Sequence, residues 1–240
     1  MNKIALFVII ILFVVIYNII KLYKDGTNIR CNDDLENSKV YKLNIDLPDK
    51  KIIDKLLSSI LNNGIKLDKL KNMNKANGLK LNYNQLQEYI PEIINYIEES
   101  QLINFSSMII GRQLYMLNGD RYKMFARLYT SNEDFIDWHY DNNFSVGLRY
   151  TLIIPLYIDM CNTSDLMIIN QKTCIKHKVD LKIGDAVLFD GSNVCHSITK
   201  QKDGCKRLTL IIPLYEKPKL GLYGKTMTFI RNIGFDIFKL

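Results

Sequence analysis

The sequence has few of the residues that usually build a zinc site or a disulfide framework. It contains five cysteines, an odd number, and no two of them form a Cys-X-X-Cys pair. This spacing excludes the common zinc-binding motifs and indicates no disulfide framework, although a single lumenal disulfide stays open. Cys174 and Cys195 fall in apolar, strand-like segments, where a free cysteine is usually a small buried hydrophobic residue.

The chain also lacks a concentrated basic surface. Its net charge is +7, but the lysines are spread along the whole sequence. No basic run alternates with aromatic residues as a groove for a nucleic-acid strand requires. Small lysine clusters at residues 50–55 and 66–75 are interpreted as solvated surface, with attraction to anionic lipid headgroups as the alternative. We therefore expect no nucleic-acid partner.

One long apolar run is present at the amino terminus. Residues 4–20 carry no charge, and an extension to Tyr23 would span ~30 Å of hydrocarbon at ~1.5 Å per residue. Lysines flank the run on both sides, and no small-residue cleavage site follows it. The pattern predicts an uncleaved transmembrane anchor over residues 1–23, against the alternatives of a signal peptide or a buried helix.

The orientation of such an anchor depends on few charges. Lys21, Lys24 and Arg30 follow the apolar run, whereas only Lys3 precedes it. The positive-inside rule then favours a single-pass membrane protein with a cytosolic catalytic domain. Placement of that domain in the lumen of the endoplasmic reticulum stays open.

Helical patterns dominate the segment after the anchor. Residues 24–46 are polar and are interpreted as a tether, and residues 47–104 as a helical support. Apolar residues at helical spacing predict a helix over 52–61 that ends at Gly64, and a second over 86–97 that kinks or restarts at Pro91. The intervening residues, 65–82, are expected to form a surface loop.

Short strand-like runs follow residue 104. Residues 113–117 and 122–129 flank an Asn-Gly-Asp turn and predict a hairpin. Further runs lie at residues 148–158, 166–169, 186–189 and 208–215. The pattern predicts an α+β protein whose core, residues 105–216, is an antiparallel double sheet of the jelly-roll type with supporting amino-terminal helices. Residues 217–240 form a tail with helical spacing, which either packs on the domain or lies on a membrane surface.

The histidines point to a metal site. The chain has three, and one of them stands two residues before an aspartate, in Trp138-His139-Tyr140-Asp141. On a strand or an extended turn, residues two apart point the same way, so both side chains can reach one ion. A further histidine would complete a set of two histidines and one carboxylate, which leaves positions on Fe(II) open for other ligands.

A distal histidine and a basic residue follow in a suggestive order. His196 lies 55 residues after Asp141, and Arg207 comes eleven residues after His196. A cation on an apolar strand needs a partner, and a guanidinium group suits a carboxylate. Thr209, two residues further along, faces the same side and can donate its hydroxyl.

This order of residues resembles the 2-oxoglutarate/Fe(II) dioxygenase superfamily, and most closely its prolyl 4-hydroxylase-like branch. Residues 184–189 (Gly-Asp-Ala-Val-Leu-Phe) before His196, and Gly204 before Arg207, are similar to a motif of that branch. Residues 127–129 (Arg-Leu-Tyr), ahead of the His-X-Asp pair, look like its Arg-Tyr strand. The resemblance covers residues 105–216 and implies a double-stranded β-helix fold.

The resemblance assigns a role to each matching residue. It implies that His139, Asp141 and His196 bind Fe(II), and that Arg207 binds the distal carboxylate of 2-oxoglutarate with help from Thr209 and Tyr129. O₂ is then a co-reactant, with ascorbate as a further expected cofactor. The sequence departs from the branch in having Arg207 where a lysine is usual, and in lacking its glycine-containing turn before His139. Both departures concern the substrate rather than the metal.

Other polar residues near these motifs have alternative interpretations. Asp137 is an outside candidate for the metal carboxylate, and His177, between two lysines, is expected to be exposed. Arg149 and Tyr150 either line the pocket or form a structural pairing.

The expected function is hydroxylation of a C–H bond by a membrane-anchored enzyme, with release of succinate and CO₂. A peptidyl proline or lysine is the favoured substrate. The alternatives are a hydroxylase of a small molecule or lipid, and a non-catalytic, membrane-tethered binding module on the same scaffold. The sequence does not indicate an oligomeric state.

Overall fold

A computed structural model describes residues 13, 17, 40–66, 76–143, 145–170, 172–217, 219–221 and 224–226. Most of the predicted anchor and most of the predicted carboxyl-terminal tail lie outside these residues. Within the described ranges, no helix is both long enough and apolar enough to cross a bilayer.

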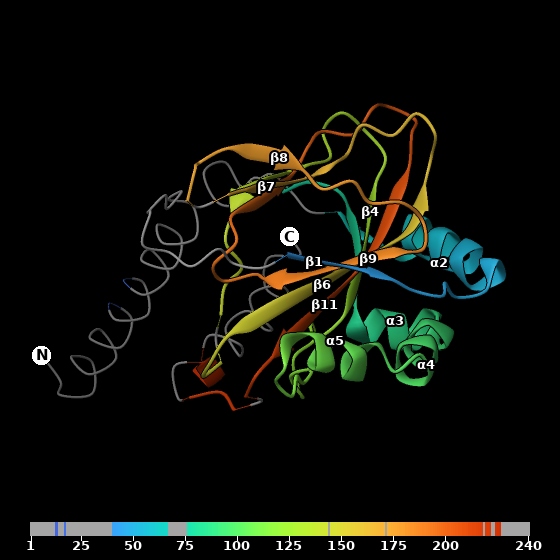
Figure 1. The fold of residues 1–240 in the computed structure, drawn as a ribbon. Helices are drawn as coiled ribbons and strands as arrows, with labels where there is room; N and C mark the ends of the chain where they lie inside the picture. The colour runs from blue at the N-terminus through green and yellow to red at the C-terminus, as the bar shows by residue number, and fades with distance from the viewer. Residues whose placement is uncertain are drawn as a thin grey trace, which may run out of the picture.

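Two antiparallel sheets form the centre of the molecule (Figure 1). The larger sheet has the strand order β1-β9-β6-β11-β4-β3-β2, and the smaller has the order β5-β10-β7-β8. The strands of the larger sheet are β1 (Val40–Asn44), β2 (Ile65–Lys66), β3 (Leu79–Asn82), β4 (Phe125–Tyr129), β6 (Arg149–Ile158), β9 (Asp185–Asp190) and β11 (Arg207–Tyr215). Those of the smaller sheet are β5 (Ile136–His139), β7 (Leu166–Ile169), β8 (Lys176–Lys178) and β10 (His196–Ile198). The predicted antiparallel double sheet is therefore confirmed.

Successive side chains of the central strands point to opposite sides, so the two faces of the larger sheet have different partners. The even-numbered residues of β11, from Leu208 to Leu214, pack in a core that includes the helices. Ile153 and Phe189, from β6 and β9, face the smaller sheet and pack against its Ile168. Because successive side chains of a strand point to opposite faces, the same strands support the helical layer and line the space between the sheets.

Four helices cover the outer face of the larger sheet: α2 (Lys50–Asn63), α3 (Tyr83–Tyr89), α4 (Pro91–Glu99) and α5 (Leu102–Ile110). In Figure 1, α3, α4 and α5 lie on one side of this sheet, and β7 and β8 lie on the other. The Asp49 carboxylate caps α2 by accepting from the Lys51 amide, and α2 ends before Gly64 as expected. Pro91 begins a new helix, which confirms the predicted restart.

Four local predictions were wrong. Residues 40–44 belong to β1 rather than to an irregular tether, and residues 65–66 and 79–82 are strands within the expected loop. The turn at residues 117–120 exists, but the predicted hairpin does not, because Tyr115 bridges to Tyr215 while β4 pairs with β3 and β11. Helix α5 extends into the segment that was expected to begin the sheets.

The four cysteines within the described residues occupy three different environments. Cys161 and Cys205 form a disulfide with a Cα–Cα distance of 5.8 Å. Cys195 is free and buried, as predicted. Cys174 is exposed and disulfide-bonded, so its interpretation as a buried hydrophobic residue was wrong.

Candidate metal centre

The three predicted metal ligands lie together between the sheets. His139 ends β5 and His196 begins β10, and the two are direct partners in the antiparallel ladder. Their ring centroids are 4.2 Å apart, and Asp141 follows β5 by two residues. One ligand atom from each of the three side chains lies within 4.8 Å of the others, which confirms that they can reach one ion.

Backbone carbonyls hold both imidazoles in the same orientation. His139 Nδ1 lies 2.7 Å from the Asp137 carbonyl oxygen, and His196 Nδ1 lies 2.9 Å from that of Val194. Each Nδ1 therefore carries the proton and donates it, which leaves Nε2 with a free lone pair. The two Nε2 atoms lie 3.8 and 3.9 Å from Asp141 Oδ1, so all three ligand atoms face a common point.

The Asp141 carboxylate is fixed by its neighbours in the larger sheet. Its Oδ2 accepts a hydrogen bond from Thr151 Oγ1 and lies 3.6 Å from the Arg149 guanidinium. Gly191 passes close to this carboxylate and accepts from the Asp141 amide at 2.7 Å. A Cβ atom at residue 191 would lie 2.5 Å from Thr151 Oγ1 and still closer to Asp141 Oδ2. The position therefore requires glycine.

Burial and charge shift the pKa values of His139 and Asp141. Burial, the main cause, and the charge of His196, the second cause, together lower the pKa of His139 to about 3. Burial raises the pKa of Asp141, but Arg149 and the two imidazoles outweigh this effect and hold it below its usual value. His139 is therefore neutral and Asp141 charged at neutral pH, the states in which these side chains bind metal.

These residues fit a divalent iron ion. Two imidazole nitrogens and one carboxylate oxygen are the donor set that non-heme Fe(II) prefers, and the backbone contacts of both Nδ1 atoms are the outer contacts that such a set needs. His139, Asp141 and His196 would hold the ion, while Thr151 and Arg149 would orient the carboxylate.

A pocket opens from the three ligands between the sheets. Four isoleucines line it: Ile136, Ile153, Ile198 and Ile211. Tyr129, Arg127 and Thr209 also contribute to its wall. Thr209 is buried and its Oγ1 has no hydrogen-bond partner, and Arg127 Nε is also buried without one. Thr209 and Tyr129 thus line the pocket, and their role in binding 2-oxoglutarate stays a prediction.

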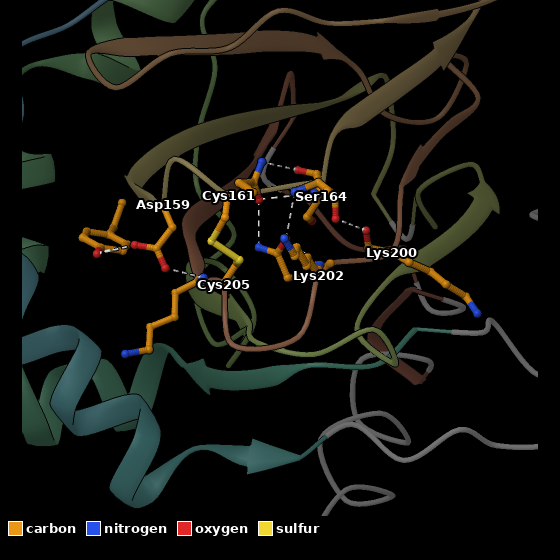
Figure 2. Close-up of a disulfide and its surroundings, with 11 residues drawn as sticks. Asp159, Cys161, Ser164, Lys200, Lys202 and Cys205 are labelled. Carbon is orange, nitrogen blue, oxygen red and sulfur yellow. Dashed lines mark hydrogen bonds between the residues drawn. A yellow bond between two sulfur atoms is a disulfide. The ribbon is translucent and has the colours of Figure 1, made fainter.

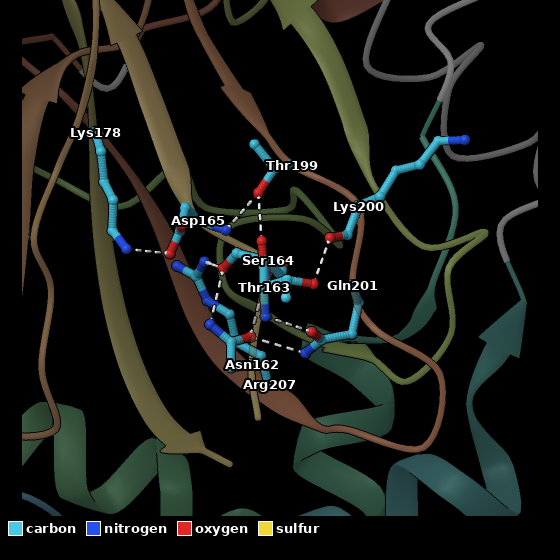
Figure 3. A network of polar contacts seen from close by, with 9 residues as sticks. All are labelled: Asn162, Thr163, Ser164, Asp165, Lys178, Thr199, Lys200, Gln201 and Arg207. Atoms are coloured by element: carbon cyan, nitrogen blue, oxygen red, sulfur yellow. Dashed lines mark hydrogen bonds and ion pairs between the residues drawn. The ribbon is translucent and has the colours of Figure 1, made fainter. Parts of the chain in front are cut away.

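Arg207 is not one of the residues that line this pocket. It is 3% exposed, and its Nη1 donates to the Ser164 carbonyl oxygen (Figure 3). Ser164 belongs to the loop that leads into β7. Gln201 fixes that loop by accepting from the Thr163 amide at 3.0 Å and donating to Asn162 Oδ1 at 2.8 Å (Figure 3). The role of Arg207 in binding 2-oxoglutarate stays a prediction.

The Cys161–Cys205 disulfide lies beside this loop (Figure 2). It joins the turn after β6 to the turn that precedes β11. Asp159 adds a parallel contact, because its carboxylate accepts from the Lys206 amide at 2.6 Å. The turn after β6 and the turn that precedes β11 are thus joined by one covalent and one polar link.

The structure resolves the remaining sequence alternatives. Asp137 is exposed and supplies its backbone carbonyl to His139, while the described metal-ligand group contains Asp141. His177 is exposed as predicted. Arg149 pairs with Asp141, whereas Tyr150 packs in the helix-facing core. The sequence analysis did not identify Thr151 and Gly191 as site residues. The only indication was that Thr151 lies within the predicted strand at 148–158 and that Gly191 closely follows the one at 186–189.

Comparisons with known proteins agree with this geometry. No family model and no curated protein matches the sequence. Among solved structures, the chain is similar to the non-heme α-ketoglutarate-dependent epimerase SnoN from nogalamycin biosynthesis, with 12% identity, a TM-score of 0.55 and coverage of 78% of this chain and 84% of SnoN.

Two further structures carry related descriptions. A 2OG-Fe(II) oxygenase family oxidoreductase from Burkholderia pseudomallei is 8% identical with a TM-score of 0.53, and covers 76% of this chain and 88% of its own. A prolyl-4-hydroxylase from Pseudomonas putida is 14% identical with a TM-score of 0.50, and covers 77% of this chain and 96% of its own. At these identities the likeness is one of fold: the chain has the double-sheet fold of 2-oxoglutarate/Fe(II) oxygenases.

Proposed function

We propose that this protein is an Fe(II)- and 2-oxoglutarate-dependent dioxygenase that hydroxylates a C–H bond. The convergence of His139, Asp141 and His196 on one point, in a fold shared with such oxygenases, carries the proposal. A binding module without catalysis would not need two oriented imidazoles and a supported carboxylate beside an open pocket.

The residues of the site have separate tasks in this reaction. Iron bound with 2-oxoglutarate and O₂ supplies the oxidant for the C–H bond, and succinate and CO₂ are released. His139, Asp141 and His196 would hold the ion, which with this ligand set would keep further positions for cosubstrate and oxygen. The isoleucine walls exclude water, while cationic and hydroxyl groups deeper in the pocket recognise the cosubstrate carboxylate.

The substrate that we propose is a peptidyl proline or lysine. The motifs around His139 and His196 support it, as does the similarity to the Pseudomonas putida prolyl-4-hydroxylase. A small molecule or lipid is the second candidate, because SnoN, of similar fold, is described in complex with Fe³⁺, α-ketoglutarate and a nogalamycin compound.

We further propose that the enzyme is anchored in a membrane through residues 4–23. The uncharged run in the sequence supports this placement. The Cys161–Cys205 disulfide favours an oxidising compartment such as the lumen of the endoplasmic reticulum for the catalytic domain. This consideration opposes the cytosolic orientation that the flanking charges favour.

The test of the proposed reaction is succinate formation from 2-oxoglutarate by the full chain with Fe(II) and O₂. The wild-type protein should produce succinate in an Fe(II)-dependent manner, and His196→Ala should not. Equal background turnover by both proteins would overturn the proposal. Mass spectrometry of proline- and lysine-containing peptides, and of small molecules, then identifies the substrate by the gain of one oxygen atom.

A further inference from the structure

The wall of the metal pocket continues along β4, away from the residues that the resemblance assigns to the cosubstrate. Tyr129, Arg127 and Phe125 are alternate residues of β4, and all three line the pocket. Tyr129 is directly opposite Arg207 of β11, whereas Phe125 is opposite Ile211 at the other end of the pairing. The stretch from Arg127 to Phe125 therefore begins where the expected cosubstrate residues end.

A second cation stands beside Arg127 on the next strand. Lys80 of β3 is the direct partner of Arg127 in the antiparallel ladder. Facing partners in such a ladder have neighbouring side chains on the same side of the sheet. Lys80 and Arg127 thus form a pair of like charges on the face that bears the pocket.

Both cations contact one aromatic ring of the pocket wall. Lys80 Nζ lies 4.6 Å from the centre of the Phe125 ring, and Arg127 Cζ lies 5.8 Å from it. Lys80 Nζ is also 3.6 Å from the centre of the Tyr122 ring, and the two rings meet edge to face with their centres 6.3 Å apart. We call these four side chains, Lys80, Tyr122, Phe125 and Arg127, the cationic shelf.

The cationic shelf has charge and hydrogen-bond donors to offer to a ligand. Like charges that face each other across a strand pair destabilise the sheet. Contact with an aromatic face stabilises a cation but leaves the N–H groups of a guanidinium without acceptors, and Arg127 Nε is buried without a hydrogen-bond partner. An anion bound between Lys80 and Arg127 would neutralise both charges and accept hydrogen bonds from both side chains.

The rest of the pocket lining does not supply this anion. Among the described residues that line the pocket, Asp141 is the acidic one, and it is a candidate metal ligand that Arg149 already pairs with. Four isoleucines make up much of the remaining wall. A complementary ligand therefore has an apolar part beside the metal centre and an anionic group at the cationic shelf.

The place of the cationic shelf in the sheet favours an extended ligand. Strands β4 and β3 follow β11 toward the end of the larger sheet, where the two-residue strand β2 is the last one described. Lys80 is not one of the residues that line the pocket. A ligand that contacts both the metal centre and Lys80 must extend beyond the pocket, as a peptide does when one residue lies at the metal and its neighbour lies on the shelf.

We propose that the cationic shelf binds a carboxylate side chain of a peptide substrate, next to the residue whose C–H bond is oxidised. This inference rests on the proposed function and narrows its substrate class to acidic peptides. Arg207, Thr209 and Tyr129 keep the role in binding 2-oxoglutarate that the resemblance implies. Lys80 and Arg127 are then specificity-determining residues.

The test is the affinity of short synthetic peptides for the full chain with 2-oxoglutarate, measured by fluorescence anisotropy with Mn(II) in place of Fe(II) to prevent turnover. The peptides carry proline or lysine at the centre, flanked by glutamate in one set and by glutamine, of the same shape, in the other. Wild-type protein should bind the glutamate set about 10-fold more tightly, as expected for a carboxylate bound by charged donors. This preference should decrease at high salt.

Variants of the two cations distinguish recognition from a structural role. Lys80→Gln and Arg127→Gln should each reduce the preference for glutamate to less than about 3-fold. The double variant Lys80→Glu/Arg127→Glu should instead prefer peptides flanked by arginine. Lys123→Gln is the matched control and should keep the wild-type preference, because Lys123 Nζ lies 3.8 Å from the centre of the Tyr83 ring, which packs against the helix-facing core. If the double variant fails to fold, the two single glutamine variants decide.

Three results would overturn the inference. They are equal affinity of the wild type for the two sets, binding of neither set, and a preference for glutamate that Lys80→Gln and Arg127→Gln leave unchanged. Each of them leaves the proposed reaction standing if the full chain still forms succinate from 2-oxoglutarate in an Fe(II)-dependent manner. Absence of that succinate would reject the proposed function itself.

Discussion

The two ends of the pocket differ in how completely the protein satisfies its own polar groups. At the metal end, each imidazole has a carbonyl partner, and Asp141 has Thr151 and Arg149. At the far end, Arg127 Nε and Thr209 Oγ1 are buried without partners. Arg149 Nε at the metal end is also buried without a partner, but the three metal ligands themselves are oriented by the protein, whereas the far end keeps two unpartnered polar groups in the pocket wall. Four predictions test this difference.

The largest effect is expected at the metal end. His139→Ala removes one of three ligands, so metal affinity should fall by more than about 100-fold, since removal of outer contacts alone costs about 10- to 100-fold. Metal content after dialysis against Fe(II) or Mn(II) measures this. His177→Ala, at an exposed histidine of β8, is the matched control and should bind metal as the wild type does. Loss of metal in the control would mean that the ion binds elsewhere.

The disulfide should affect stability rather than metal binding. Cys161→Ser opens the link between the turns before β7 and β11, and should lower the free energy of unfolding by about 2 to 4 kcal/mol. Denaturant titration measures the change, with metal affinity determined in parallel. Cys195→Ser, at a free thiol, removes no covalent link and is the comparison variant. A loss of metal binding in Cys161→Ser under native conditions would show that the two ends are not independent.

Gly191 tests how closely the carboxylate is confined. In Gly191→Ala the added methyl group must displace Asp141 or Thr151, at a cost of about 1 to 3 kcal/mol. We expect weaker metal binding together with a lower melting temperature. Gly221→Ala is the control, because a Cβ atom there meets nothing within 4 Å. Unchanged metal affinity in Gly191→Ala would indicate that the carboxylate can move without loss of the site.

The smallest of these effects is expected from Thr151. Thr151→Val keeps the side-chain shape but removes the hydrogen bond to Asp141 Oδ2, and should weaken metal binding by about 10-fold. Calorimetric titration with Mn(II) measures it. Thr173→Val, in an exposed turn, should have no effect. If Thr151→Val bound metal normally, Arg149 alone would suffice to orient the carboxylate.

Local pattern was enough to predict some of this architecture. The spacing of His139 and Asp141, the stop at Gly64 and the restart at Pro91 depend on neighbouring residues, and all three were predicted. The pairing of His196 with His139 depends on the register of two strands far apart in the sequence, and only the resemblance pointed to it. The same applies to the Cys161–Cys205 link, because sequence alone cannot give the connectivity of cysteines.

The errors have equally physical causes. Helix α5 consists mainly of apolar and β-branched residues, and a short apolar run does not distinguish a helix from a strand. Strand β1 is a short edge strand with one fully buried residue, so its pattern resembled that of a polar tether. Arg127 was interpreted only as part of a motif, since the burial of its Nε without a hydrogen-bond partner depends on the three-dimensional arrangement.

Alternate residues of strand β11 face two different parts of the molecule. Its even-numbered leucines and isoleucine pack in the core with the helices, while Thr209 and Ile211 line the pocket. Mutations at the odd-numbered positions can therefore change which ligands the pocket binds without disrupting the core between the sheet and the helices. Such a division allows the repertoire of reactions to diversify over evolutionary time while the architecture persists.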